Sequence, residues 1–191
     1  YMNPEGVVCL NGDDDKLCTI IQVHGKKPVF FGKGENCEVK ARDIESLGLE
    51  GSKALVEEAG AEKEFNIRLN VPGEHMVFNA LAAIAVGRTL GLTTEELIAG
   101  IAKTGSVGGR SNIIRDDKLT VIDDCYNANP VSMKAAIDLL ETAKGRKVAL
   151  LGDMFELGEK EKELHREVGT FLAGKNVDAA ICVGELAKEI H

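Results

Sequence analysis

The residues best suited to chemistry gather between Val121 and Met133, in the stretch VIDDCYNANPVSM. Its apolar start predicts a buried strand and Pro130 predicts the start of a helix, so the polar residues between them form a strand-to-helix loop. In parallel α/β sheets, ligands bind at the carboxyl ends of the strands. An aspartate there, Asp123 or Asp124, can accept hydrogen bonds from both hydroxyls of a ribose. The loop is therefore the first candidate for a binding site.

Three more polar side chains of this loop, Tyr126, Asn127 and Asn129, are candidates for contacts to a ligand. The two asparagines also have a purely structural alternative, because short polar residues before a helix cap its first backbone N–H groups. Spacing alone leaves both interpretations open. Cys125 has two acids and a tyrosine as neighbours, which raise rather than lower the pKa of a thiol, so we do not expect it to act as a nucleophile.

A second candidate site lies earlier in the chain, where Gly73-Glu74-His75 is followed by Asn79. His75 and Asn79 are one turn apart near the start of a predicted helix, so they share a face of that helix. A carboxamide in this position can pair with the edge of an adenine through one donor and one acceptor. The alternative is that both side chains only cap or decorate the helix, and the spacing by itself favours that alternative.

Four further residues stand out by their positions. Arg110 follows a Gly-Gly pair, where its guanidinium group could grip phosphates through paired hydrogen bonds. Asp153 and Glu156 follow another predicted parallel strand, so we expect them at the same sheet edge as Asp124. His165 lies inside the next predicted helix, where we expect a packing or surface role rather than a catalytic one.

The elements that position these residues follow from the hydrophobic pattern. Strand, helix, strand, helix, strand in the second half predict a parallel, right-handed βαβαβ unit. The first half predicts a β-rich segment and two helices, and residues 103–109 (KTGSVGG) predict a linker. The expected strands span 7–10, 27–31, 38–44, 53–56, 65–71, 112–114, 119–122, 147–151 and 179–183, and the expected helices span 74–90, 93–102, 132–143 and 159–172.

The chain has 191 residues, of which 44% are hydrophobic and 28% charged, and its formal net charge is -8. This length suits one large or two small globular domains. The acidic balance, without a basic stripe, argues against a nucleic-acid partner. No apolar run approaches the roughly 20 residues of a membrane span and the start has no signal-peptide pattern, so we expect a cytoplasmic protein. Five cysteines without C-x-x-C spacing favour reduced thiols over disulfides or zinc.

Two negative observations limit the chemistry. The sequence contains no G-x-x-x-x-G-K-[ST] phosphate loop and no G-x-G-x-x-G opening a helix, so a phosphate cradle is missing from this polypeptide.

The run Asn11-Gly12-Asp13-Asp14-Asp15 could bind a metal through its acids. It lacks the distal glutamate of an EF-hand loop, however, so a solvated turn is the favoured interpretation.

Four ordered motifs resemble those of the Mur ligases. They are G-x-H-x-x-x-N-A-L-A-A at 73–83, Gly-Arg at 109–110, D-D-x-Y-N-A-N-P at 123–130 and G-D-M-x-E-L-G at 152–158. The last two look most like the branch of the family that adds D-alanyl-D-alanine. The resemblance implies an α/β chain in two parts. Residues 1–106 would be the later part of the central ATP-binding domain, and residues 107–191 the first part of a Rossmann-like C-terminal domain.

The activity that the resemblance implies is an ATP-dependent amide ligation in peptidoglycan synthesis. D-alanyl-D-alanine would be joined to a UDP-N-acetylmuramoyl-tripeptide through an acyl phosphate. By resemblance, Asn79, with His75 near it, would contact adenine, Arg110 would reach the phosphates and Asp124 would hold the ribose. Cys125 stands where the family usually has serine. The residues implied to face the peptide substrates are Tyr126, Asn127, Asn129, Asp153 and Glu156.

The family's phosphate loop, magnesium-binding glutamate and modified lysine would all precede Tyr1. We therefore expect no catalytic residue and no metal ligand in this chain and no ligation by it alone, with ATP and Mg²⁺ bound by the full-length enzyme. Two alternatives stay open. One is another Mur or folylpolyglutamate-type ligase, against which D-D-x-Y-N-A-N-P argues. The other is a non-catalytic module that binds a ligand at the Rossmann-like edge.

Overall fold

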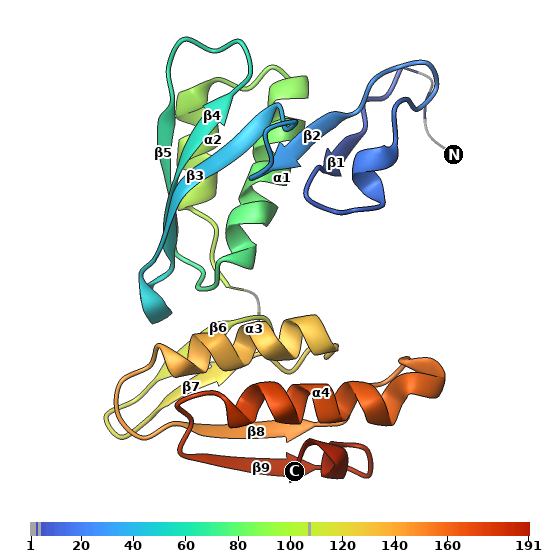
Figure 1. Ribbon diagram of the computed structural model, residues 1–191. Coiled ribbons are helices and arrows are strands. Elements are labelled where there is room, and N and C mark those ends of the chain that lie inside the picture. The colour runs from blue at the N-terminus through green and yellow to red at the C-terminus, as the bar shows by residue number, and fades with distance from the viewer. Residues whose placement is uncertain (1–2, 4, 107) are drawn as a thin grey trace. The chain divides into compact units, whose positions relative to one another are not determined.

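The computed structural model describes residue 3 and residues 5–106 and 108–191 of the chain (Figure 1). Contacts divide the chain into two compact units, Tyr1–Gly105 and Ser106–His191. Each unit has hydrophobic core clusters of its own. In the described part, no helix is long and apolar enough to cross a membrane.

The first unit is built on a five-stranded mixed sheet in the order β1-β2-β3-β4-β5. β1 and β2 are parallel, as are β2 and β3, whereas β3, β4 and β5 pair antiparallel. The alternating pattern at 65–71 predicts a half-exposed antiparallel strand, and β5 confirms it, since every second residue is buried. The strands are β1 (Cys9–Asn11), β2 (Val29–Gly32), β3 (Val39–Ser46), β4 (Ser52–Glu58) and β5 (Phe65–Leu69), and η1 (Leu17–Thr19) and η2 (Gly48–Glu50) are short 3-10 helices.

Two helices, α1 (His75–Thr89) and α2 (Thr94–Ala102), pack on this sheet, α1 against β1 to β4 and α2 against β5 (Figure 1). Small buried residues, including Ala80 and Ala85, let α1 approach the strands closely. Thr93 and Glu96 form a capping box at the start of α2, the pattern that a threonine followed three residues later by a glutamate predicts. The Thr93 hydroxyl accepts from the Glu96 N–H, and the Glu96 carboxylate accepts from the Thr93 N–H.

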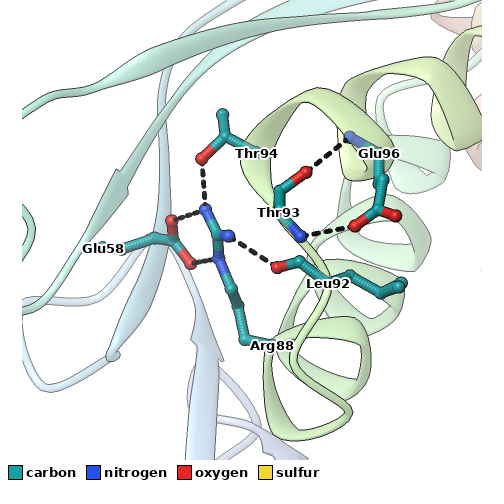
Figure 2. A network of polar contacts seen from close by, with 6 residues as sticks. All are labelled: Glu58, Arg88, Leu92, Thr93, Thr94 and Glu96. Atoms are coloured by element: carbon teal, nitrogen blue, oxygen red, sulfur yellow. Dashed lines mark hydrogen bonds and ion pairs between the residues drawn. The ribbon is translucent and has the colours of Figure 1, made fainter.

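Arg88 ties the end of α1 to the sheet and to the start of α2 (Figure 2). Its guanidinium group donates to both carboxylate oxygens of Glu58 on β4, at 2.7 and 2.6 Å. It also donates to the Leu92 carbonyl at 2.8 Å and to the Thr94 hydroxyl at 2.6 Å. One side chain therefore joins three elements at the point where the chain turns from α1 into α2.

The second unit contains a hairpin, two helices and a parallel strand pair. β6 and β7 pair antiparallel across a turn in which the Asp116 carboxylate accepts from the N–H groups of Lys118 and Leu119. The elements are β6 (Asn112–Arg115), β7 (Thr120–Asp123), α3 (Pro130–Glu141), β8 (Val148–Gly152), α4 (Glu161–Ala173) and β9 (Ala179–Val183), with 3-10 helices η3 (Gly158–Lys160) and η4 (Ala187–Ile190).

The parallel ladder in this unit joins β8 and β9. The pattern predicts a third parallel strand at β7, but the ladder found for β7 is the one with β6. The tight turn explains why β6 and β7 pair antiparallel, since two strands joined directly by a short turn cannot lie parallel. The β8-α4-β9 part of the predicted unit is present as expected.

α3 and α4 supply the core of the second unit, where they pack on each other and on the strand pair. Ile137, Met154 and Val168 are buried at this centre. The alternate residues of β8 and β9 are apolar but exposed, with Val148 at 44% and Leu150 at 70%. Ile181 and Val183 of β9 are also exposed.

Candidate functional site

The loop after β7 is held against residues 109–111 by backbone and carboxylate hydrogen bonds. The Gly109 N–H donates to Asp123 Oδ2 at 3.0 Å, and the Tyr126 N–H donates to the Gly109 carbonyl at 2.9 Å. The Ser111 N–H donates to Asp124 Oδ1 at 2.7 Å. Three contacts therefore fix the segment around Arg110 to the end of β7.

Asp124, the predicted ribose ligand, uses Oδ1 to hold the Ser111 N–H. Ser111 is buried and has a positive φ of 47°, a conformation that L-residues seldom adopt without support from a contact of this kind. A carboxylate has about four lone-pair positions, so one backbone bond leaves Asp124 able to accept from a ribose hydroxyl. The residue is half-buried, and a ligand can reach it.

Arg110, the predicted phosphate ligand, is exposed, and its guanidinium carbon lies 4.2 Å from the ring centroid of Tyr126. This is within cation–π distance. Among the residues that the structure describes, Arg110 has no ion pair with a carboxylate. Sequence reasoning singled out both residues separately and missed that they stack. A spacing of sixteen positions gives no local signal for such a contact.

The two asparagines of the loop have local partners. Asn129 is the N-cap of α3: its side chain accepts from the Ser132 N–H, and the Ser132 hydroxyl accepts from the Asn129 N–H. The structure thus gives Asn129 the capping role that was the alternative to ligand binding. Asn127 Oδ1 accepts from the N–H of the next residue, Ala128, at 2.8 Å, and its side chain is exposed.

Cys125 donates its thiol proton to Asp123 Oδ1 at 3.1 Å. The hydrogen bond to Asp123 and the negative charge of Asp123 raise the pKa of the Cys125 thiol. This agrees with the prediction that Cys125 is not an activated nucleophile. The same thiol hydrogen bond, with the Gly109 N–H, holds the pKa of Asp123 below its usual range.

In the first unit, His75 and Asn79 are both exposed in the first turns of α1. Asn79 Nδ2 lies 3.4 Å from the sulfur of Met76, a weak acceptor that water or a ligand can displace. The His75 ring lies over Gly73, where a β-carbon would collide with it. Both side chains are therefore positioned on one accessible helix end.

Asp153 and Glu156 follow β8 as predicted. Asp153 Oδ1 accepts from the Ala187 N–H at 2.6 Å, and a β-carbon on Gly184 would overlap its carboxylate, so Asp153 ties the ends of β8 and β9 together. Glu156 is exposed and has a positive φ of 62°.

His165 confirms the expectation of a packing role. It is fully buried, with Nε2 accepting from the Met154 N–H at 2.9 Å and Nδ1 placed 2.6 Å from the Glu161 carbonyl. Because Nε2 must accept, the proton is on Nδ1 and the ring is neutral.

Two of the three acids in the Asn11 to Asp15 run, Asp13 and Asp14, accept hydrogen bonds from backbone N–H groups. The Asp13 carboxylate accepts from the Lys33 and Gly34 N–H groups at 2.7 and 2.8 Å, and Asp14 Oδ1 accepts from the Lys16 and Leu17 N–H groups at 2.9 Å. No group of three or more histidine, cysteine or acidic side chains in the described part of the chain could hold a metal ion. Asp13 and Asp14 thus stabilise turns of the first unit.

Comparisons with known proteins agree with this picture. Residues 1–87 match the Mur ligase middle domain, and residues 109–191 match the Mur ligase, glutamate ligase domain. The chain belongs to the Mur ligase family. A curated relative from Bacillus subtilis, a UDP-N-acetylmuramoyl-tripeptide–D-alanyl-D-alanine ligase, is 34% identical over 188 residues, which is 97% of this chain and 39% of the relative. The chain therefore spans about two fifths of the length of such relatives.

Solved structures show the same likeness over the whole chain. The MurF of Acinetobacter baumannii has a TM-score of 0.89 and 33% identity, and the match covers 100% of this chain and 41% of that one. The MurF of Thermotoga maritima, solved in complex with ADP, has a TM-score of 0.81 and 29% identity over 96% of this chain and 42% of that one. These neighbours confirm the predicted α/β class with a Rossmann-like C-terminal part.

Proposed function

We propose that these 191 residues belong to an ATP-dependent ligase that joins D-alanyl-D-alanine to a UDP-N-acetylmuramoyl-tripeptide. The observation that carries the proposal is the match to MurF relatives along nearly the whole chain, at 34% identity. Residues 1–106 would form the later part of the ATP-binding middle domain, and residues 107–191 the first part of the C-terminal domain. ATP supplies the phosphoryl group that activates the peptide carboxylate.

The residues of the chain would bind and orient the nucleotide. Asn79, with His75 beside it, would pair with the adenine edge, since both side chains are accessible at the start of α1. Asp124 would accept from the ribose hydroxyls. Arg110 would hold phosphate oxygens through its N–H donors. These donors lie in one plane, and their spacing matches a pair of phosphate oxygens.

The peptide substrates would meet the two segments that follow β7 and β8. Asp153 and Glu156 follow β8, while Tyr126 and Asn127 follow β7, and Tyr126, Asn127 and Glu156 are exposed. Asn129 would contribute indirectly, because its side chain already caps α3. These segments offer carboxylates for an ammonium group and amides for peptide hydrogen bonds.

The test is a ligation assay with the enzyme that contains these residues. With ATP, Mg²⁺, UDP-N-acetylmuramoyl-tripeptide and D-alanyl-D-alanine, we expect one phosphate released per nucleotide product, whose mass gains the dipeptide. Omitting the dipeptide or offering single amino acids is the control. Ligation of a single amino acid in place of D-alanyl-D-alanine would assign the chain to another branch of the family and refute the proposal.

A second assay uses the 191-residue chain alone. Because its sequence has no phosphate loop, we expect no substrate-dependent phosphate release. Calorimetry with ATP should show only very weak binding that Asn79→Ala removes. Micromolar binding that is insensitive to Asn79→Ala would contradict the adenine assignment and favour a binding module of another kind.

A further inference from the structure

The stack of Arg110 on Tyr126 is an arrangement for which the proposed function so far gives no reason. Both side chains are exposed, and an exposed arginine normally samples many rotamers, so fixing it costs conformational entropy. Here the guanidinium carbon is 4.2 Å from the ring centroid. The ring therefore restricts the arginine before any ligand arrives.

The ring is itself well placed to do this, because its backbone is bound to the residue before Arg110. The Tyr126 N–H donates to the Gly109 carbonyl at 2.9 Å, and the Gly109 N–H donates to Asp123 at 3.0 Å. A β-carbon on Gly109 would lie 3.2 Å from Tyr126 Cβ, and Gly109 has a φ of +74°, so both close approach and conformation favour glycine. The Tyr126 ring and the Arg110 side chain are therefore held by the same short set of backbone contacts.

Stacking also leaves the arginine chemically available. A guanidinium group carries its five N–H donors in its plane, and a ring below it occupies a face and none of the donors. A carboxylate partner would take up those donors and neutralise the charge. The two acids at the end of β7, Asp123 and Asp124, instead accept from the backbone N–H groups of Gly109 and Ser111.

We propose that Tyr126 is a positioning residue, whose ring holds the Arg110 guanidinium group in the orientation that meets a phosphate of the nucleotide. The inference rests on the proposed function for the role of Arg110, and on the observed stack for the role of Tyr126. The ring supplies the effect, so the hydroxyl group is dispensable.

The kinetic test compares two variants in the enzyme that contains this chain. Tyr126→Leu should raise KM for ATP about two- to fivefold, the range expected from an exposed cation–π contact. Tyr126→Phe keeps the ring and should keep the KM for ATP close to that of the unmodified enzyme. In an Arg110→Gln background, Tyr126→Leu should have no further effect. An equal defect with and without Arg110, or a Phe variant as impaired as the Leu variant, would overturn the proposal.

A spectroscopic test uses the 191-residue chain and needs no ligation. The side-chain N–H of Arg110 should show an upfield ring-current shift in ¹H–¹⁵N spectra, present with Tyr126→Phe and lost with Tyr126→Leu. A Leu variant that melts like the unmodified chain shows that folding is intact. Absence of the shift in the unmodified chain would refute the inference even if ligation occurs. A shift in the chain together with an enzyme that ligates nothing would refute the proposed function alone.

Discussion

The Asp123 carboxylate accepts hydrogen bonds from both the Cys125 thiol and the Gly109 N–H. The thiol hydrogen bond and then the Gly109 N–H hold the pKa of Asp123 low. A lowered folded-state pKa stabilises the fold above the ordinary aspartate pKa of about 3.9, and this contribution is lost as the pH falls through the lowered value. The contact is therefore fully present at neutral pH.

The matching effect on Cys125 can be measured directly. Because Asp123 raises the pKa of the Cys125 thiol, less thiolate is present at a given pH, and alkylation is slow. Asp123→Asn should make iodoacetamide modify Cys125 faster at pH 8. Peptide mass spectrometry measures the rate of this modification. Exposed Cys18 in the same chain is the internal control and should react at an unchanged rate. An unaltered Cys125 rate would show that Asp123 does not control the thiol.

His165 is a buried residue whose two ring nitrogens both have backbone partners. His165→Ala leaves the Met154 N–H without an acceptor and creates a cavity, so we expect a loss of about 2–4 kcal/mol in unfolding free energy. His165→Gln places an acceptor near the position of Nε2 and should lose clearly less. Urea denaturation gives both values. Equal losses would mean that packing volume, and not the hydrogen bond, is the important property.

At the scale of elements, the Arg88 network joins β4, α1 and α2 (Figure 2). The Arg88 and Glu58 side chains are 30% and 13% exposed, so solvent screens the pair only in part. Arg88→Lys keeps the charge but loses the two-point contact with Glu58, and we expect it to cost about 1–3 kcal/mol of unfolding free energy.

The matched control for Arg88→Lys is the exposed pair of Lys53 and Glu45, at 50% and 57% exposure. Lys53→Met should change stability by less than about 0.5 kcal/mol, because surface ion pairs contribute little. Chemical denaturation compares the two variants. If both cost the same, the contacts of Arg88 with Leu92 and Thr94 add nothing to an ordinary surface pair.

The elements that sequence predicted well are those specified by local chemistry. The hydroxyl of Thr93 with Glu96 three residues later defines the start of α2, and the alternation from Phe65 onward defines β5. The pairing partner of β7 was harder to predict, because the sequence of an apolar strand does not specify which strand it pairs with. For the same reason, the contacts of Asp123 with Gly109, fourteen positions away, came only from the structure.

The site was predicted as a set of residue types and not as an arrangement. Asp124 and Arg110 were identified by position and by family resemblance, but their partners are Ser111 and Tyr126, which lie thirteen and sixteen positions away. Asn129 was ambiguous because the same amide oxygen serves a helix cap or a ligand, and only the Ser132 contacts decide between these structurally.

For the whole molecule, the relevant feature is that the two units have separate cores. Ile84→Ala removes side-chain volume from the first core and Ile137→Ala from the second, each at an expected cost of about 2–4 kcal/mol. Hydrogen exchange followed by mass spectrometry should show lost protection mainly in residues 1–105 for the first variant and mainly in 106–191 for the second. A uniform loss over both units with either variant would show one cooperative structure.

The open apolar side of β8 and β9, with Leu150 and Ile181 exposed, also governs how a concentrated sample of this chain behaves. Contiguous apolar surface favours association between molecules, and excluded salts such as sulfate strengthen it. Solubility should therefore fall steeply in ammonium sulfate, and a charged residue in place of Leu150 should restore it. The exposed apolar side chains of β8 and β9 therefore limit the concentration at which the isolated chain stays in solution.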